Sequence, residues 1–355
     1  MSHKIKILKL ALLLFSFTTT ISAQDLDVSK WIQPVPESAK FGLPDYMVWC
    51  GSMVKGDDNK YYLFYSRWPR TSGHYAWVTE SEVAVAVSDN PTGPYKHVKV
   101  VLPKRDKRFW DADVTHNPTI YKFGKKYYLY YMGTKGTETF KTPVTMSTPG
   151  WWEYRNNQRI GVAVASSPLG PWKRSEKPLI DTTNNSFDHM LTNNPAVTRR
   201  PDGKILLIYK GVSNGKMPFG GKVMHGAALA DKPEGPFVKL PNRVFVKVGE
   251  QFAAEDPYIW CQNGKYWAIV KDMSGAFTNA GTSLALFESA DGMDWKPAKN
   301  VLITTTQIPW ITGTKRVTKL ERPQLWMDNG IPKVLFCAVY DGEDNYNVAI
   351  PLKCN

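Results

Sequence analysis

The sequence has few of the residue patterns that mark metal- and nucleotide-dependent enzymes. Its six histidines show no HExxH motif or comparable paired spacing, so a catalytic zinc is not expected. No glycine-rich phosphate loop or Rossmann fingerprint occurs, which argues against a bound nucleotide. The four cysteines are widely scattered without a CxxC pair, so a dense disulfide framework is also excluded. We expect no required cofactor and no metal ligands, with a structural calcium ion as the open alternative.

Long hydrophobic runs are equally scarce. The one strong apolar run lies at the start, where three lysines precede LALLLFSF and the small residues TTTISA, the order that is typical of a secretory signal peptide. This run is shorter than the roughly 20 residues that a membrane-spanning helix needs. We therefore expect residues 1–23 to be a bacterial signal peptide cleaved near Ala23. Residues 24–355 would then be an exported protein, periplasmic or secreted, with no membrane span.

Acidic residues are outnumbered by basic ones. The chain has 45 Lys and Arg against 32 Asp and Glu, which gives a formal net charge of +13. A basic surface can attract nucleic acid, anionic membranes or acidic polysaccharides, although it can also serve solubility alone. Export argues against nucleic acid as the partner, so an anionic polysaccharide stays open. The charge predicts no oligomeric state.

What the sequence does contain is one phrase that recurs five times. Each copy sets polar residues before a proline or its equivalent, followed by an apolar run, a turn signal and a β-branched or aromatic run. Four prolines mark the copies and stand 77, 62 and 66 residues apart: Pro118, Pro195, Pro257 and Pro323. Such a period is typical of a repeat architecture. The copies are WCGSMVKGDDNKYYLFYSRW, THNPTIYKFGKKYYLYYMGT, TNNPAVTRRPDGKILLIYKGV, AEDPYIWCQNGKYWAIVKDM and LERPQLWMDNGIPKVLFCAV.

Each repeated unit has the composition of three or four antiparallel strands. Turn signals such as CQNGK and MDNGIP predict hairpins, and a third strand-like run such as GVAVASSPLGPW follows. Such a unit cannot bury both of its faces alone, so the units should pack radially as blades. We predict an all-β, single-domain five-bladed β-propeller, with a stacked β-sandwich as the structural alternative. The predicted blades lie near residues 46–100, 110–175, 188–240, 250–298 and 318–355.

The fifth unit ends after three recognisable strands, so a strand from residues 28–40 is expected to complete it and close the ring. In a propeller the first strand of each blade lines the central axis. The residues just before the prolines should therefore face a common funnel. These pairs are Cys50-Gly51, His116-Asn117, Asn193-Asn194, Glu255-Asp256 and Glu321-Arg322.

Several carboxylates in one funnel supply the chemistry of glycoside hydrolysis. That reaction needs one protonated acid for the leaving oxygen and one ionised carboxylate on the other side of the sugar. Further acids stand shortly upstream of three of the repeated phrases: Asp45, Asp111, Asp113 and Asp188. Aromatic side chains such as Trp49 offer flat faces for sugar rings. The spacing thus favours a carbohydrate-active site at the axis.

The five phrases, together with GVAVASSPLGPW and EDPYIW, resemble the five-bladed propeller superfamily that includes glycoside hydrolase families 43, 62, 32, 68 and 117. The resemblance covers essentially the whole chain after the signal peptide. It implies a glycosidase in which one aspartate is the general base, a second tunes a pKa, and a glutamate is the general acid. The first phrase has CGS where family 43 has its general base. Only Glu255-Asp256, in EDP, keeps the aspartate before proline that resembles the family motif. By analogy with family 117, His116 is a further candidate.

From these patterns we predict a set of site residues. The expected base and pKa-setting carboxylate are Asp113 and Asp256 in either order, with Glu255 or Glu321 as the acid and Asp188 in reserve. The predicted substrate-binding residues are His116, Asn117, Asn194, Arg322, Trp49 and Asp45. Among these, the planar guanidinium of Arg322 suits a carboxylate or a sulfate.

Three functions remain open at this point. The first is an exported glycosidase that acts on the ends of plant or algal poly- or oligosaccharides, because a narrow funnel admits a chain end more readily than a chain middle. The second is a non-catalytic carbohydrate-binding propeller, suggested by the missing acid in CGS. The third is a polysaccharide lyase acting on uronates, suggested by the positive charge together with His116 and Arg322.

Overall fold

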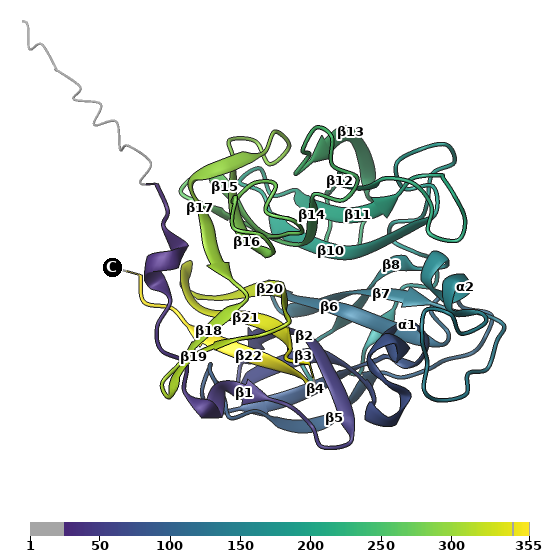
Figure 1. The fold of residues 1–355 in the computed structure, drawn as a ribbon, viewed down its shortest axis with the longest axis horizontal. Helices are drawn as coiled ribbons and strands as arrows, with labels where there is room; N and C mark the ends of the chain where they lie inside the picture. The colour runs from purple at the N-terminus through teal and green to yellow at the C-terminus, as the bar shows by residue number, and fades with distance from the viewer. Residues whose placement is uncertain (1–24, 343, 355) are drawn as a thin grey trace, which may run out of the picture.

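Five four-stranded antiparallel sheets make up most of the protein (Figure 1). The computed structural model describes residues 25–342 and 344–354, so the predicted signal peptide lies outside the described residues. The first sheet contains β2 (Tyr46–Lys55), β3 (Tyr61–Pro69), β4 (Glu82–Ser88) and β5 (Lys96–Leu102). The second contains β6 (Val114–Phe123), β7 (Lys126–Thr134), β8 (Arg159–Ala165) and β9 (Lys173–Arg174).

The third and fourth sheets repeat this order of strands, and the fifth takes its outermost strand from the N-terminal segment. The third contains β10 (Leu191–Arg199), β11 (Ile205–Val212), β12 (Val223–Ala230) and β13 (Val238–Val244). The fourth contains β14 (Ala254–Gln262), β15 (Lys265–Asp272), β16 (Ser283–Ser289) and β17 (Lys296–Thr305). The fifth contains β20 (Lys319–Asp328), β21 (Ile331–Tyr340), β22 (Asn345–Pro351) and β1 (Lys40–Phe41).

The sheets form a ring around one axis. The first strand of each sheet contacts the first strands of both neighbouring sheets, in the order β2, β6, β10, β14, β20 and back to β2. Apolar clusters fill the space between adjacent sheets; Phe64 and Val85 of the first sheet, for example, share one cluster with Leu129 and Tyr131 of the second. Each sheet therefore buries its faces against its neighbours. The predicted all-β, five-bladed propeller is confirmed.

Short turns follow from asparagine and glycine. The β14–β15 hairpin has the two-residue loop Asn263-Gly264, and the β20–β21 hairpin has Asn329-Gly330. All four residues have positive φ, between 49° and 78°. Two consecutive left-handed residues make the tight turn whose twist suits a hairpin, which explains the NG signal in both phrases.

The N-terminal segment reaches the fifth sheet, although with a shorter strand than expected. Lys40 and Phe41 pair with Val348 and Asn347 of β22. Most of the predicted strand over residues 28–40 is not extended. It contains the 3₁₀ helices η1 (Val28–Trp31) and η2 (Glu37–Ala39), separated by a segment with prolines at two positions.

The remaining elements are small. A hairpin of β18 (Gln307–Trp310) and β19 (Gly313–Arg316) connects the fourth and fifth sheets. The helical turns η3 (Arg70–Ser72), η4 (His74–Ala76) and α1 (Trp77–Glu80) connect β3 to β4. The helix α2 (Trp151–Asn156) precedes β8 and contacts α1. Within the described part of the chain, no helix is long and apolar enough to cross a membrane.

Candidate active site

One backbone irregularity recurs at the start of every innermost strand. In each case a non-glycine residue has a φ between 51° and 57°, and the register to the next strand shifts at that point. The five residues are Cys50, Asn117, Asn194, Asp256 and Arg322. Neighbouring side chains on a regular strand point to opposite faces. The bulge places both residues of a pair on the axis instead, as bulges beside functional sites commonly do.

The position of the bulge changes which two residues of the first blade correspond to the axial pairs of the other blades. The register shift between Trp49 and Ser52 makes Trp49 and Cys50 the equivalents of His116 and Asn117. The predicted pair Cys50-Gly51 was therefore displaced by one residue. The correction brings Trp49 into the cavity, as predicted for it, where its ring lies edge-on to His74 with 5.9 Å between centroids.

The five bulge residues form a chain of hydrogen bonds across the axis. Cys50 Sγ donates to Asn117 Oδ1 over 2.7 Å, and Asn117 Nδ2 donates to Asn194 Oδ1. Asn194 Nδ2 then donates to Asp256 Oδ1 over 2.6 Å, and Arg322 Nη1 reaches the same oxygen over 3.4 Å. Each side chain is thereby fixed by its neighbour in the next blade, which makes the floor of the site rigid.

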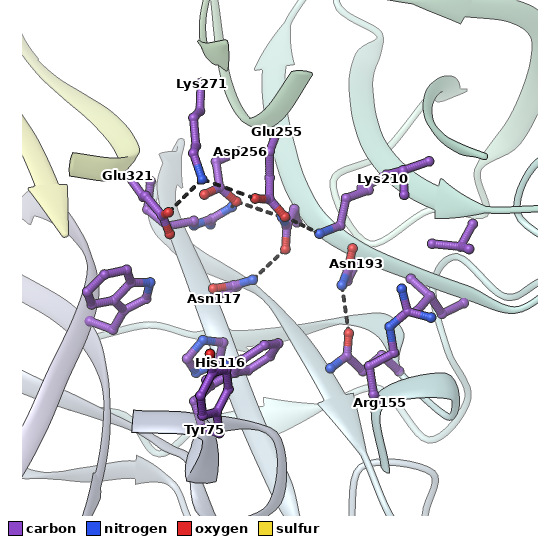
Figure 2. A pocket seen from close by; sticks show the side chains of 18 of the residues that line it. Tyr75, His116, Asn117, Arg155, Asn193, Lys210, Glu255, Asp256, Lys271 and Glu321 are labelled. Carbon is purple, nitrogen blue, oxygen red and sulfur yellow. Dashed lines mark hydrogen bonds and ion pairs between the residues drawn. The ribbon is translucent and has the colours of Figure 1, made fainter. Parts of the chain in front are cut away.

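A cavity of about 310 Å³ lies above this floor and receives side chains from all five blades (Figure 2). The inner pairs of four blades line it, so the predicted convergence of His116, Asn117, Asn194, Glu255, Asp256, Glu321 and Arg322 is what the structure has. Aromatic rings form much of the remaining wall. Besides Trp49, the aromatic lining residues are Trp68, Tyr75, Trp77, Trp151, Phe219 and Phe252.

Two of the three cavity acids share one lysine. Lys271 Nζ lies 2.5 Å from Glu321 Oε1 and 3.6 Å from Glu255 Oε2, and Lys210 pairs with Glu255 from the other side (Figure 2). Burial alone would favour a neutral Glu255, but the two lysines outweigh it and lower the pKa of Glu255. Burial likewise opposes the charge on Lys271, yet Glu321 and Glu255 raise its pKa. Glu255 is therefore held ionised.

The third acid behaves in the opposite way. Asp256 is 4 % exposed, and burial together with the charges of Glu255 and Glu321 raises its pKa to about 6, although Arg322 opposes the shift. Both hydrogen bonds that it accepts from described residues go to Oδ1. Its second oxygen can therefore carry a proton towards the cavity. Adjacent positions of one strand thus hold an ionised and a readily protonated carboxyl group.

His116 lies on the wall beside these acids as a neutral ring. Its Nδ1 is 2.7 Å from Ser81 Oγ, and Trp77 stacks on it with 4.9 Å between centroids. Burial, with a contribution from Arg322, lowers the pKa of His116 well below its usual range. The ring is therefore suited to hydrogen bonding rather than to carrying charge.

Three predicted acids do not line the cavity. Asp113 accepts hydrogen bonds from Lys107 and Tyr154 over 2.7 and 3.2 Å, which turn it towards the loop after β7. Asp45 is exposed, and its backbone carbonyl accepts the N–H of Arg70. Both residues precede the bulge, so neither is rotated to the axis. Their expected roles in catalysis and substrate binding have no support in their position.

Asp188 also points away from the axis, into space that Gly211 leaves beside β11. It is buried against β11, where Tyr209 and Lys239 donate to it over 3.0 and 2.5 Å. A Cβ on Gly211 would lie only 2.7 Å from the Cβ of Asp188. Asp111 is held in the same way by Tyr131 and Arg105 in the second blade. These acids fix the segments that lead into β6 and β10.

The sequence reasoning missed the lysines of the site. Lys210 and Lys271 lie in β11 and β15, paired directly with Asn193 and Glu255, the first residues of the inner pairs. A signal was present, because each lysine interrupts an otherwise apolar strand, in ILLIYKGV and YWAIVKDM. Arg155 and Gln158 also line the cavity from α2 and the residues after it, and no repeated pattern marks them.

The described residues include no group of three His, Cys, Asp or Glu side chains that could hold a metal ion. The four cysteines are free thiols.

Comparison of the fold identifies a set of similar solved structures, although no protein family model and no curated protein matches the sequence. One is Zg3597, a family 117 glycoside hydrolase of the marine bacterium Zobellia galactanivorans, at 19 % identity and a TM-score of 0.60, with 90 % of this chain and 89 % of that chain covered. A structure described as a glycoside hydrolase matches at 14 % identity and a TM-score of 0.66, covering 92 % and 93 %. The Bacillus subtilis arabinanase Arb43A matches at 16 % identity and a TM-score of 0.56, covering 88 % and 97 %. At these identities the similarity shows a shared fold.

Proposed function

We propose that this protein is an exported glycoside hydrolase that removes a terminal sugar from plant or algal poly- or oligosaccharides. The observation that carries the proposal is the pair of carboxyl groups at Glu255 and Asp256, whose pKa values are shifted in opposite directions inside one cavity. A glycosidase needs one protonated and one ionised carboxyl group, and opposite pKa shifts of two neighbouring acids provide both. The similar solved structures, which include several glycoside hydrolases, support the same function.

Each acid has a role in this proposal, and the roles of Asp256 and Glu255 are the reverse of those expected from the sequence, because the pKa of Asp256 is raised and that of Glu255 is lowered. Asp256 donates its proton to the glycosidic oxygen as the bond between that oxygen and the anomeric carbon breaks. Glu255, which is ionised, accepts a proton from a water molecule as the oxygen of that water bonds to the anomeric carbon, and the leaving group departs with the proton from Asp256. Glu321 anchors Lys271, which in turn keeps Glu255 ionised. Asn117, Asn194 and His116 offer hydrogen-bonding groups to sugar hydroxyls, and Trp49 and Trp77 offer ring faces.

The shape of the site supports action at chain ends. A volume of about 310 Å³ is near the lower limit for a pocket that encloses a small organic ligand. Its aromatic wall includes Tyr75, Trp77 and Trp151, which lie together, since Trp151 Nε1 donates to the carbonyl of Tyr75 over 3.0 Å. A pocket of this size holds a terminal residue more readily than the middle of a long chain.

The experiment is a hydrolysis screen of the purified protein against plant and algal oligosaccharides, with Asp256→Asn and Glu255→Gln as test variants. We expect release of a terminal sugar by the wild type and a loss of about 100-fold or more in kcat for each variant. Asp231→Asn is the matched control, since Asp231 is 81 % exposed and pairs with Lys204 on the surface. Internal cleavage from the first time points would contradict the action at chain ends.

The two alternatives give different outcomes in the same screen. A carbohydrate-binding propeller would bind oligosaccharides without cleaving any of them. The feature that favours this alternative is Cys50, which occupies the position of an acid on the floor of the site. A uronate lyase would release products that absorb in the ultraviolet because elimination creates a double bond. Hydrolysis without that absorbance would separate the proposed function from both.

A further inference from the structure

The cavity has an excess of positive charge. Five cationic side chains line it against three acids, and they are Arg155, Lys210, Lys271, Lys319 and Arg322. Three of these cations form ion pairs with the cavity acids. Lys319 contacts His74 rather than an acid, and burial followed by the charge of Lys319 lowers the pKa of His74. A neutral substrate would leave this excess uncompensated.

Arg155 is the unpaired cation with the most defined surroundings. Its Nη1 donates to Asn156 Oδ1 over 2.9 Å and to the carbonyl of Phe219 over 2.7 Å, and its guanidinium lies 5.0 Å from the centroid of the Phe219 ring. These contacts hold the group in place without neutralising it, since no described carboxylate forms an ion pair with it. Burial lowers the pKa of Arg155 to about 10, so it stays charged at neutral pH.

A buried donor without a partner lies next to Arg155. The side chain of Gln158 is fully buried, and its Oε1 accepts a hydrogen bond of 2.6 Å from Asn193 Nδ2. Its Nε2 has no hydrogen-bond partner, although the residue lines the cavity. An unsatisfied buried N–H group is costly unless a ligand completes it. Figure 2 shows Arg155, Asn193 and Lys210 on one side of the cavity, opposite Glu321.

From this arrangement we infer that Arg155, Gln158 and Lys210 form a subsite for an anionic group on the sugar, a carboxylate or a sulfate ester. A guanidinium beside an amide N–H and an ammonium group presents three kinds of donor to the oxygens of one anion. The subsite borders the acids of the proposed mechanism, since Lys210 pairs with Glu255, whereas Arg155 forms no ion pair with a described carboxylate. The subsite therefore selects a charged sugar while the carboxyl groups act on its anomeric carbon.

This inference rests on the proposed glycosidase function, and binding tests it separately from turnover. Isothermal titration calorimetry would compare galacturonic acid and galactose 6-sulfate with galactose, using the wild-type protein. We expect one of the charged sugars to bind at least about tenfold more tightly than galactose, which corresponds to one or two charge-assisted hydrogen bonds. Preference for the uronate identifies a carboxylate as the anion, and preference for the sulfated sugar identifies a sulfate.

Variants of Arg155 locate the preference. Arg155→Gln should reduce the ratio of affinities to near one, while Arg155→Lys should restore part of it because the charge is kept. Arg316→Gln is the matched control, since Arg316 is exposed in the β18–β19 hairpin and outside the cavity. Thermal unfolding of each variant verifies that the fold is retained.

The outcomes separate the two proposals. Equal binding of the three sugars, no binding of any of them, or a preference that survives in Arg155→Gln would overturn the anionic subsite. Hydrolysis of neutral oligosaccharides with no charge preference would overturn it while leaving the glycosidase function intact. Tight binding of a charged sugar through Arg155 with no hydrolysis of any oligosaccharide would overturn the glycosidase function and leave the anionic subsite intact.

Discussion

Replacement of Asp256 by asparagine should stabilise the protein while it abolishes activity. Burial and two neighbouring acids raise the pKa of Asp256 from 3.8 to about 6. The folded protein therefore binds this proton more tightly than the unfolded chain does. Between pH 4 and 6 the folded state holds more protons, so the contribution of Asp256 to the free energy of unfolding falls as the pH rises. A difference of about two pKa units corresponds to about 3 kcal/mol, which is lost above pH 6.

Asparagine resembles the protonated form of this side chain. It keeps an oxygen that can accept the hydrogen bonds from Asn194 Nδ2 and Arg322 Nη1, which both reach Oδ1 in the wild type. It has no charge to bury at any pH. The gain in the free energy of unfolding should thus be near zero at pH 4 and should approach about 3 kcal/mol at pH 8.

The assay is urea unfolding followed by tryptophan fluorescence at pH 4, 6 and 8 for the wild type and Asp256→Asn. Asp231→Asn serves again as the control and should change the free energy of unfolding by less than about 0.5 kcal/mol at each pH. The reasoning fails if Asp256→Asn is no more stable than the wild type at pH 8. It also fails if the difference between the two proteins does not depend on pH.

Three further predictions concern the acids and their partners. If Asp256 supplies the proton, kcat/KM should fall as the pH rises through about 6; a profile that is flat from pH 5 to 8 would contradict this role. Lys271→Met removes one of the two cations that keep Glu255 ionised, so the acidic limb of the pH profile of kcat should move to higher pH; a limb unchanged from the wild type would contradict this. Asp111→Asn leaves two arginines beside a buried neutral group and should lower the free energy of unfolding by about 3 kcal/mol in urea, with an unchanged KM.

The fold and the axial residues could be predicted because they depend on local patterns. Strand runs, Asn-Gly turns and a repeated proline are visible in the sequence, and a propeller brings the start of each repeat to one axis. The placement of Glu255, Asp256, Glu321 and Arg322 follows from that geometry alone. The one-residue displacement at Cys50 arose because Gly51 stands where the other repeats have proline.

The acids upstream of the repeats could not be placed in this way. Whether Asp113 or Asp188 reaches the axis depends on where the bulge begins and on which side chain binds each carboxylate. Lys107 binds Asp113 from the preceding loop, and Lys239 binds Asp188 from β13, a strand about 50 residues later. Such tertiary partners leave no periodic signal. The same holds for Arg155, whose place in the cavity is set by α2 and its contact with the carbonyl of Phe219.

The composition of the fifth sheet has a consequence for the order in which the chain folds. This sheet combines residues 40–41 with residues 319–351, so its strands come from parts of the chain that are far apart in sequence. Four blades can assemble from contiguous stretches of chain, whereas the fifth needs Lys40 and Phe41 to pair with β22 near the other end of the described residues. Pairing over such a sequence separation is slow, because a long loop must close before any contact compensates for it. Completion of the ring is therefore the late step, and the hydrogen-bonded floor, which needs Arg322, cannot form before the fifth blade is in place.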